Sequence, residues 1–89
     1  MESEDKPYVI ISQQEGNTRL DVGTDLNSYE SDLGACRSGS GSVIFCRYGI
    51  TQEKYDLALE ARDGIHEKPY VEVKQKVKGL VGKLTGETQ

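Results

Sequence analysis

The sequence predicts a single α+β domain in two layers, with a small three-stranded sheet covered by helices. The chain has 89 residues, which suits one small domain with a modest core. Three apolar stretches rich in β-branched and aromatic residues are typical of strands, and three others carry apolar residues at helical spacing. Their order along the chain predicts strand, strand, helix, strand, helix, helix. The compact domain is expected to span residues 7–84.

The first two strands are expected to form a hairpin. Residues 1–6 hold no apolar residue beyond the initiating Met and are expected to form a flexible acidic tail. The run 7–12 (PYVIIS) is β-branched and aromatic, which favours a strand. The polar segment 13–17 suits a hairpin loop, and 18–23 alternates polar and apolar residues as a half-buried strand does.

A short helix is predicted over 25–34. Thr24 or Asp25 can cap its first turn, and Gly34 suits the left-handed residue that follows many helix ends. The run 37–42 is expected to be a flexible loop. Residues 34–40 have the glycine spacing of a phosphate-binding loop, but they lack the required Lys and precede a strand, which favours a flexible connector. The apolar residues of the helix fall at positions i, i+3 and i+7: Leu26, Tyr29 and Leu33.

The most apolar stretch, 42–48 (SVIFCRY), is predicted to be the central strand. Thr51 is expected to cap the next helix, which ends before Pro69. The segment 70–84 is predicted to be a helix, although its valines leave a strand open. Residues 85–89 are expected to be disordered. The apolar faces of the two helices are Tyr55, Ala58, Leu59 and Ile65, then Val73, Val77, Leu80, Val81 and Leu84.

The charge distribution disfavours a dedicated nucleic-acid binder. The net charge is −4, and the acidic residues concentrate in the first 34 positions, whereas phosphate binding needs clustered Lys and Arg. The chain holds no apolar run long enough for a membrane span, and its acidic N-terminus is unlike a signal peptide. A cytoplasmic protein that does not bind membranes is expected.

The cysteines and the single histidine do not assemble a recognisable catalytic or metal site in the sequence. A structural zinc site needs four ligands at short spacing, which Cys36, Cys46 and His66 cannot supply. Cys46 lies in an apolar run and is expected to be a small core residue. Cys36 has Arg37 beside it, yet a nucleophile also needs a positioned base. We therefore expect no enzyme activity, no cofactor and no metal.

Tyrosines and arginines near the middle of the chain are the candidate contact residues, because both residue types are enriched at binding hot spots. An alternative is that the tyrosines belong to the core and the arginines are solvated. The contact reading predicts a small non-catalytic interaction or regulatory module that binds another macromolecule, a protein in the first place. The apolar stripe of the last helix also allows a homodimer. The candidate interaction residues are Tyr29, Arg37, Arg47, Tyr48 and Arg62.

The order of the elements and the residues that open them resemble the GIY-YIG nuclease domain over residues 7–68. Residues 8–11 (YVII) are similar to the first motif of that family, and 20–23 (LDVG) are similar to the second. The likeness continues through Asp25-Leu26 and 57–60 (LALE). The resemblance implies a nucleic-acid-binding or residual metal-dependent nuclease domain, which is the alternative function.

The catalytic residues of that family are not matched. Its two motif tyrosines would fall on Ile10 and Asp21, and the segment around Tyr29 lacks the catalytic Arg. Its metal-binding Glu would align with Glu60 or Arg62. Because metal-assisted cleavage needs a divalent ion and a cation on the phosphate, the resemblance implies a degenerate member.

Overall fold

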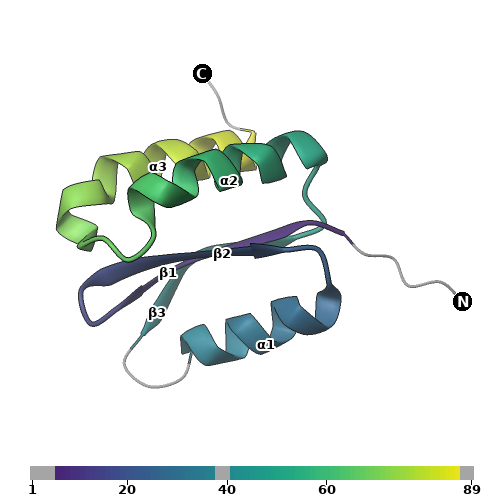
Figure 1. Ribbon diagram of the computed structural model, residues 1–89, viewed down its shortest axis with the longest axis horizontal. Coiled ribbons are helices and arrows are strands. Elements are labelled where there is room, and N and C mark those ends of the chain that lie inside the picture. The colour runs from purple at the N-terminus through teal and green to yellow at the C-terminus, as the bar shows by residue number, and fades with distance from the viewer. Residues whose placement is uncertain (1–5, 38–40, 87–89) are drawn as a thin grey trace, which may run out of the picture.

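The computed structural model describes residues 6–37 and 41–86, and it confirms the α+β class and the expected order of elements. Figure 1 shows how these strands and helices follow one another along the chain. Expectations for residues 1–5, 38–40 and 87–89 lie outside the described residues. The elements are β1 (Tyr8–Gln14), β2 (Asn17–Gly23), α1 (Leu26–Arg37), β3 (Ser42–Tyr48), α2 (Gln52–Ile65) and α3 (Tyr70–Thr85).

The sheet has the strand order β2-β1-β3, and both neighbouring pairs are antiparallel. The prediction that 42–48 is the central strand was wrong, because β1 lies in the centre and β3 at an edge. Every residue from Tyr8 to Ser12 is buried, whereas β3 alternates between exposed and half-buried positions. The register between β1 and β3 shifts between Ile11 and Ser12, which leaves Ile44 without a partner in the ladder as a bulge.

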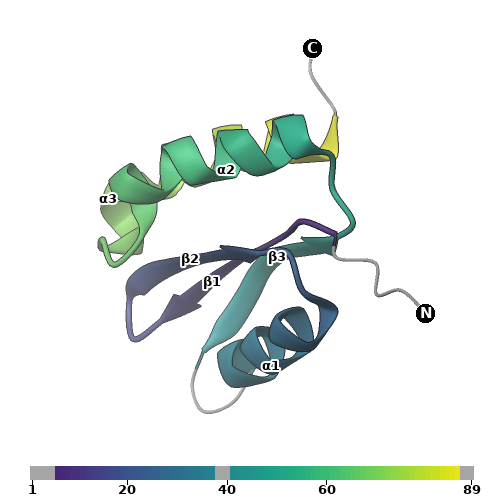
Figure 2. The same ribbon diagram turned by 45° about the vertical axis from the view of Figure 1, so that its right-hand side comes forward.

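Helices cover both faces of the sheet, which gives three layers where two were expected. Figures 1 and 2 show α1 on one face and the α2–α3 pair on the other. The reason lies in β1, whose successive side chains point to opposite faces and are all apolar from Tyr8 to Ile11. Tyr8 and Ile10 pack under α1, whereas Val9 and Ile11 pack under α2 and α3. A strand of this kind needs cover on each side.

The larger core lies between the sheet and the α2–α3 pair. The helix predicted over 70–84 is confirmed, and its apolar stripe is buried within the chain itself: Val73, Val77, Leu80 and Leu84. Ala58 and Ile65 of α2 are buried in the same cluster. Leu59, expected on this face, is 42% exposed because it lies one position beyond the buried stripe of α2.

The ends of the helices are set by local hydrogen bonds. The Asp25 carboxylate accepts a hydrogen bond from the Ser28 N–H at 3.0 Å, and Thr51 Oγ1 accepts one from the Lys54 N–H at 3.2 Å, as expected for caps. Helix α1 continues past Gly34 to Arg37, which carries Cys36 into the smaller core. Helix α3 continues through Thr85 and ends at Gly86 in the left-handed conformation.

Candidate interaction edge of the sheet

The outer edge of β2 is closed by the segment that joins α2 to α3. The Thr18 N–H donates to the Lys68 carbonyl at 2.8 Å, and the Glu67 N–H donates to the Thr18 carbonyl at 2.7 Å. The Tyr70 N–H donates to the Gly16 carbonyl at 2.8 Å. The linker thus takes the place of a short fourth strand beside the first part of β2, where it satisfies the Gly16 carbonyl and both backbone groups of Thr18.

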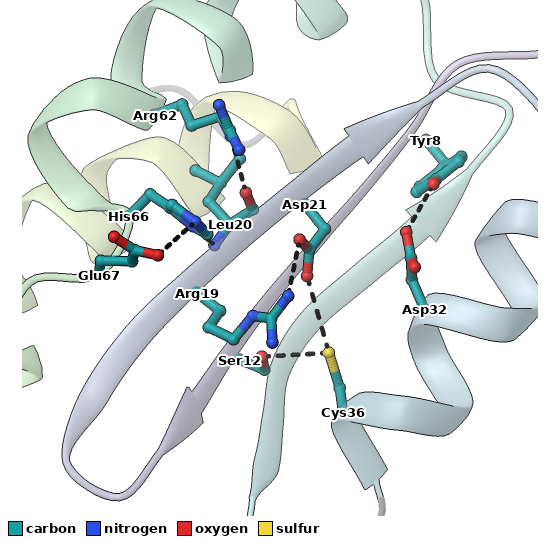
Figure 3. Close-up of polar contacts among 10 residues, drawn as sticks. All are labelled: Tyr8, Ser12, Arg19, Leu20, Asp21, Asp32, Cys36, Arg62, His66 and Glu67. Carbon is teal, nitrogen blue, oxygen red and sulfur yellow. Dashed lines mark hydrogen bonds and ion pairs between the residues drawn. The ribbon is translucent and has the colours of Figure 1, made fainter.

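Two side chains complete this closure at Leu20, as Figure 3 shows. The Leu20 N–H donates to His66 Nδ1 at 3.1 Å, and Arg62 Nε donates to the Leu20 carbonyl at 3.2 Å. His66 Nε2 lies 3.6 Å from a Glu67 carboxylate oxygen. Nδ1 is therefore unprotonated and accepts the hydrogen bond of Leu20, so this nitrogen has a structural role.

Arg62 was predicted to be an interaction residue, but the structure places it against β2 and apart from the other candidates. Its guanidinium replaces a neighbouring strand as a donor to Leu20. The sequence could not show this bond, because it joins residues 42 positions apart in the chain. Arg62 therefore belongs to the closed β2 edge, and its role as an interaction residue stays a prediction.

The outer edge of β3 differs, because in the described part of the chain β3 is hydrogen-bonded to β1 alone. Helix α1 packs on β1 and β3, whereas α2 packs mainly on β2 and α3 packs on β2 and α2. The Gly49 N–H donates to the Pro7 carbonyl at 2.8 Å, so Pro7 and Gly49 form a hydrogen-bonded pair, and this shows which residues of β3 bond toward β1. Because bonding alternates along an antiparallel pair, Phe45 and Arg47 bond toward β1, and the backbone N–H and C=O of Cys46 point outward.

Aromatic side chains gather where α1 crosses this edge. The ring of Tyr29 packs edge-on against Tyr8 at a centroid distance of 5.2 Å, and against Tyr48 at 5.5 Å. The Tyr8 hydroxyl donates to the Asp32 carboxylate at 2.8 Å. Burial, followed by this hydrogen bond, raises the pKa of Tyr8 well above its ordinary value. These ring contacts and the Tyr8–Asp32 hydrogen bond attach α1 to the sheet.

The other face of β3 carries Phe45 and Arg47. The Arg47 guanidinium lies 5.5 Å from the centroid of the Phe45 ring, within the range of a cation–π contact. Arg37 ends α1 and is exposed. Burial, the largest cause, raises the pKa of Tyr29, and the positive charges of Arg37 and Arg47 partly offset this rise. The structure thus brings Tyr29, Arg37, Arg47 and Tyr48 around the β3 edge.

The hydroxyl of Tyr29 provides a pH-dependent reporter of this region. Burial first, and then a hydrogen bond with Cys46, raises the pKa of Tyr29 from 10.0 to about 12. Because the folded state holds the proton more tightly, the stabilisation is complete below pH 10 and is lost as the pH rises through 12.

We expect ultraviolet absorbance titration of the folded protein to show a tyrosine that ionises near pH 12, and Tyr29→Phe to remove that step. Titration in denaturant is the control, in which every tyrosine should ionise near its ordinary pKa. Ordinary ionisation of all the tyrosines in the folded protein would contradict the packing described for Tyr29.

A second polar cluster lies beneath α1 and was not foreseen from the sequence (Figure 3). The Ser12 hydroxyl donates to Cys36 Sγ at 3.3 Å, and Cys36 Sγ lies 3.9 Å from an Asp21 carboxylate oxygen. Arg19 pairs with the same carboxylate at 3.4 Å. Cys36 is only 1% exposed, so this thiol is not placed for a nucleophile that a substrate must reach. Both cysteines are free thiols.

The positions singled out by the GIY-YIG resemblance lie on β1, β2 and α2. Ile10 and Asp21 lie opposite each other in the β1–β2 ladder, and the Asp21 carboxylate points to the α1 side. Glu60 belongs to α2, where it lines a groove of about 480 Å³ between α2 and α3. Among residues 6–37 and 41–86, no group of three or more His, Cys, Asp or Glu side chains is placed to hold a metal ion.

Comparison with known proteins identifies no relative of this chain. No family model, no curated protein and no solved structure matches the chain. Within the described segments, no helix combines the length and apolar character that crossing a bilayer requires. The function must therefore be argued from the arrangement of the residues themselves.

Proposed function

We propose that this chain is a small non-catalytic interaction module that binds another protein chain by adding an extended strand to the outer edge of β3. The observation that carries the proposal is the contrast between the two edges of the sheet. The β2 edge is closed by the 66–70 segment, whereas the described residues provide no such cover for β3. An uncovered edge presents backbone donors and acceptors in the arrangement that an incoming strand requires.

The side chains around this edge favour binding to a protein. Cys46 and Tyr48 pack toward the α1 face, and Phe45 and Arg47 lie on the opposite face. An added strand would therefore meet contact residues above and below the sheet. Backbone hydrogen bonds would supply affinity, and the tyrosine and arginine side chains would supply specificity. The bulge at Ile44 limits the regular part of the edge to the second half of β3.

The test removes the outward backbone donor without removing the edge side chains. Proline lacks an N–H and is tolerated in an edge strand where that group faces solvent, so Cys46→Pro should fold and block strand addition. Cys46→Ser is the matched control, since it alters the thiol and retains the N–H. Circular dichroism and a denaturation curve establish that both variants are folded.

The tagged protein and both variants are then used to capture partners from a nuclease-treated lysate of the native host. We expect a protein that is retained by the parent chain and by Cys46→Ser but is lost with Cys46→Pro. Equal retention by all three chains would overturn the assignment to the β3 edge. Recovery in an untreated lysate alone would make nucleic acid the ligand and would favour the nuclease-like alternative.

A further inference from the structure

We propose that the strand accepted by the β3 edge is β3 of a second copy, paired antiparallel about Cys46 so that two sheets become one. This inference rests on the proposed function, because it names the occupant of the same edge. A two-fold symmetric dimer uses one surface of each copy twice, so the surface must be complementary to itself. The edge of β3 meets this condition in a single register.

Backbone alternation restricts the available registers. We call a residue of β3 outward-bonding when its backbone N–H and C=O point away from β1. Across an antiparallel pair of β3 strands, such a residue can face only another outward-bonding residue. The two-fold axis must therefore pass beside one residue of β3, and the regular part of the strand offers Phe45, Cys46, Arg47 and Tyr48. An axis at Tyr48 would set Arg47 opposite Gly49 of the second copy, where a φ of +83° ends the strand, so three registers remain. With Cys46 at the axis, the N–H and C=O of each Cys46 bond to those of the other copy.

The side chains select among these three registers. An axis at Arg47 places the two arginines directly opposite each other, which is unfavourable for like charges. An axis at Phe45 places the bulge residue Ile44 in the two pairs next to the axis, opposite Cys46 of the second copy, and so disrupts the centre of the ladder. An axis at Cys46 instead sets Phe45 opposite Arg47 of the second copy on both sides of the axis.

That Cys46 register repeats a contact that the single chain already makes. Arg47 lies over Phe45 of its own strand at 5.5 Å, so in the dimer each ring has an arginine beside it in the same strand and another across the ladder. The same register moves the bulge residue Ile44, which is 36% exposed, away from the axis to the outer pairs of the ladder, opposite Tyr48 of the second copy. Arg47 is the only charged residue of β3, and this register moves the two arginines to diagonal positions.

The second copy is a better occupant at this edge than at the last helix. A homodimer through α3 was expected to use its apolar stripe, but that stripe is buried against the protein's own sheet and α2. Among the described residues β1 is the only strand paired with β3, so an added strand at this edge needs no rearrangement of the core. The inferred dimer therefore lies on the opposite side of the domain from the one that the sequence suggested.

Disulfide trapping tests this register directly. Opposed residues in a hydrogen-bonded antiparallel pair have Cα atoms roughly 5.5 Å apart, which is within the range that a disulfide spans. With diamide as the oxidant, two Cys46 thiols lose two electrons and two protons to form the S–S bond, and diamide is reduced to its hydrazine. We expect the parent chain and Cys36→Ser to give a cross-linked dimer, and Cys46→Ser to give none.

A control separates the proposed interface from random collision. Val71 on α3 is 83% exposed, so Val71→Cys in a chain with both native cysteines changed to Ser presents a thiol more accessible than that of Cys46. We expect this variant to cross-link far more slowly than the parent chain. Equal or faster cross-linking through position 71 would overturn the β3 dimer and would favour the last helix.

Sedimentation equilibrium under reducing conditions provides the second readout. We expect the parent chain to dimerise and Cys46→Pro to raise the dimer dissociation constant by about tenfold or more, through loss of the central hydrogen bonds. A parent chain that remains monomeric would overturn this inference alone if it still captures a partner that Cys46→Pro loses. If Cys46→Pro retains both the dimer and the partner, the proposed function fails as well.

Discussion

Replacing Gly23 by Ala is expected to lower the free energy of unfolding by about 1–3 kcal/mol, the usual cost of overfilling a packed core. Gly23 lies directly opposite Tyr8 in the β1–β2 ladder. A Cβ atom at this position would lie 2.6 Å from the Tyr8 hydroxyl oxygen and 2.7 Å from a ring carbon. Tyr8 is 2% exposed, so its ring cannot move into solvent without opening the smaller core.

The same displacement would break a polar contact. The Tyr8 hydroxyl donates to Asp32 of α1, and its ring packs against Tyr29. A shift of the ring therefore loosens the attachment of α1 to the sheet as well as the strand pairing. Near-ultraviolet circular dichroism should change together with stability, since the tyrosine packing is altered.

Gly34→Ala provides the matched control for this substitution. Gly34 lies inside α1, and a Cβ atom there would meet nothing within 4 Å. Because Ala is a better helix former, this change should raise the free energy of unfolding by about 0.5–1 kcal/mol. Both variants are measured by urea denaturation. Equal effects at the two glycines would contradict the close approach of Tyr8 to Gly23.

His66→Ala is the second substitution with a large expected effect. It removes the acceptor of the Leu20 N–H, and Leu20 is fully buried. An unsatisfied buried donor costs about 1–3 kcal/mol, so the free energy of unfolding should fall by that amount. Because this bond closes the β2 edge, the variant should also aggregate more readily at high concentration.

His66→Asn tests whether the acceptor is what matters. The Asn side-chain oxygen can occupy a position close to that of Nδ1 and accept the same hydrogen bond. We expect this variant to retain most of the stability that His66→Ala loses, as judged by thermal and urea denaturation. If the two variants are equally destabilised, the role of His66 lies in the packing of its ring rather than in its bond to Leu20.

The sequence predicted the parts of the fold that depend on residues close together in the chain. The hairpin, the caps at Asp25 and Thr51, and α3 could all be predicted from spacing and residue type. The prediction that β3 is the central strand was wrong, because it assumed that the most apolar segment is also the most buried. The continuous apolar run of β1, without polar alternation, is typical of a strand covered on both faces.

The candidate site depended on contacts that no local pattern contains. The closure of the β2 edge joins Thr18 to residues near the end of α2, and Leu20 to a histidine 46 positions away. Sequence reasoning grouped Arg62 with the other arginines because it could not see that bond. Tyr29 and Tyr48 pack against the smaller core cluster, which is what the alternative reading of the tyrosines as core residues predicts, and their role in binding stays a prediction.

Amide hydrogen exchange at the two edges of the sheet tests the central claim most directly. At concentrations where the chain is monomeric, the Leu20 amide should exchange slowly because His66 accepts its hydrogen bond, and the Cys46 amide should exchange rapidly. Addition of a strand at β3 should then slow the exchange of the Cys46 amide. Slow exchange at Cys46 in the dilute monomer would show that this edge is already covered, and would contradict its role in binding.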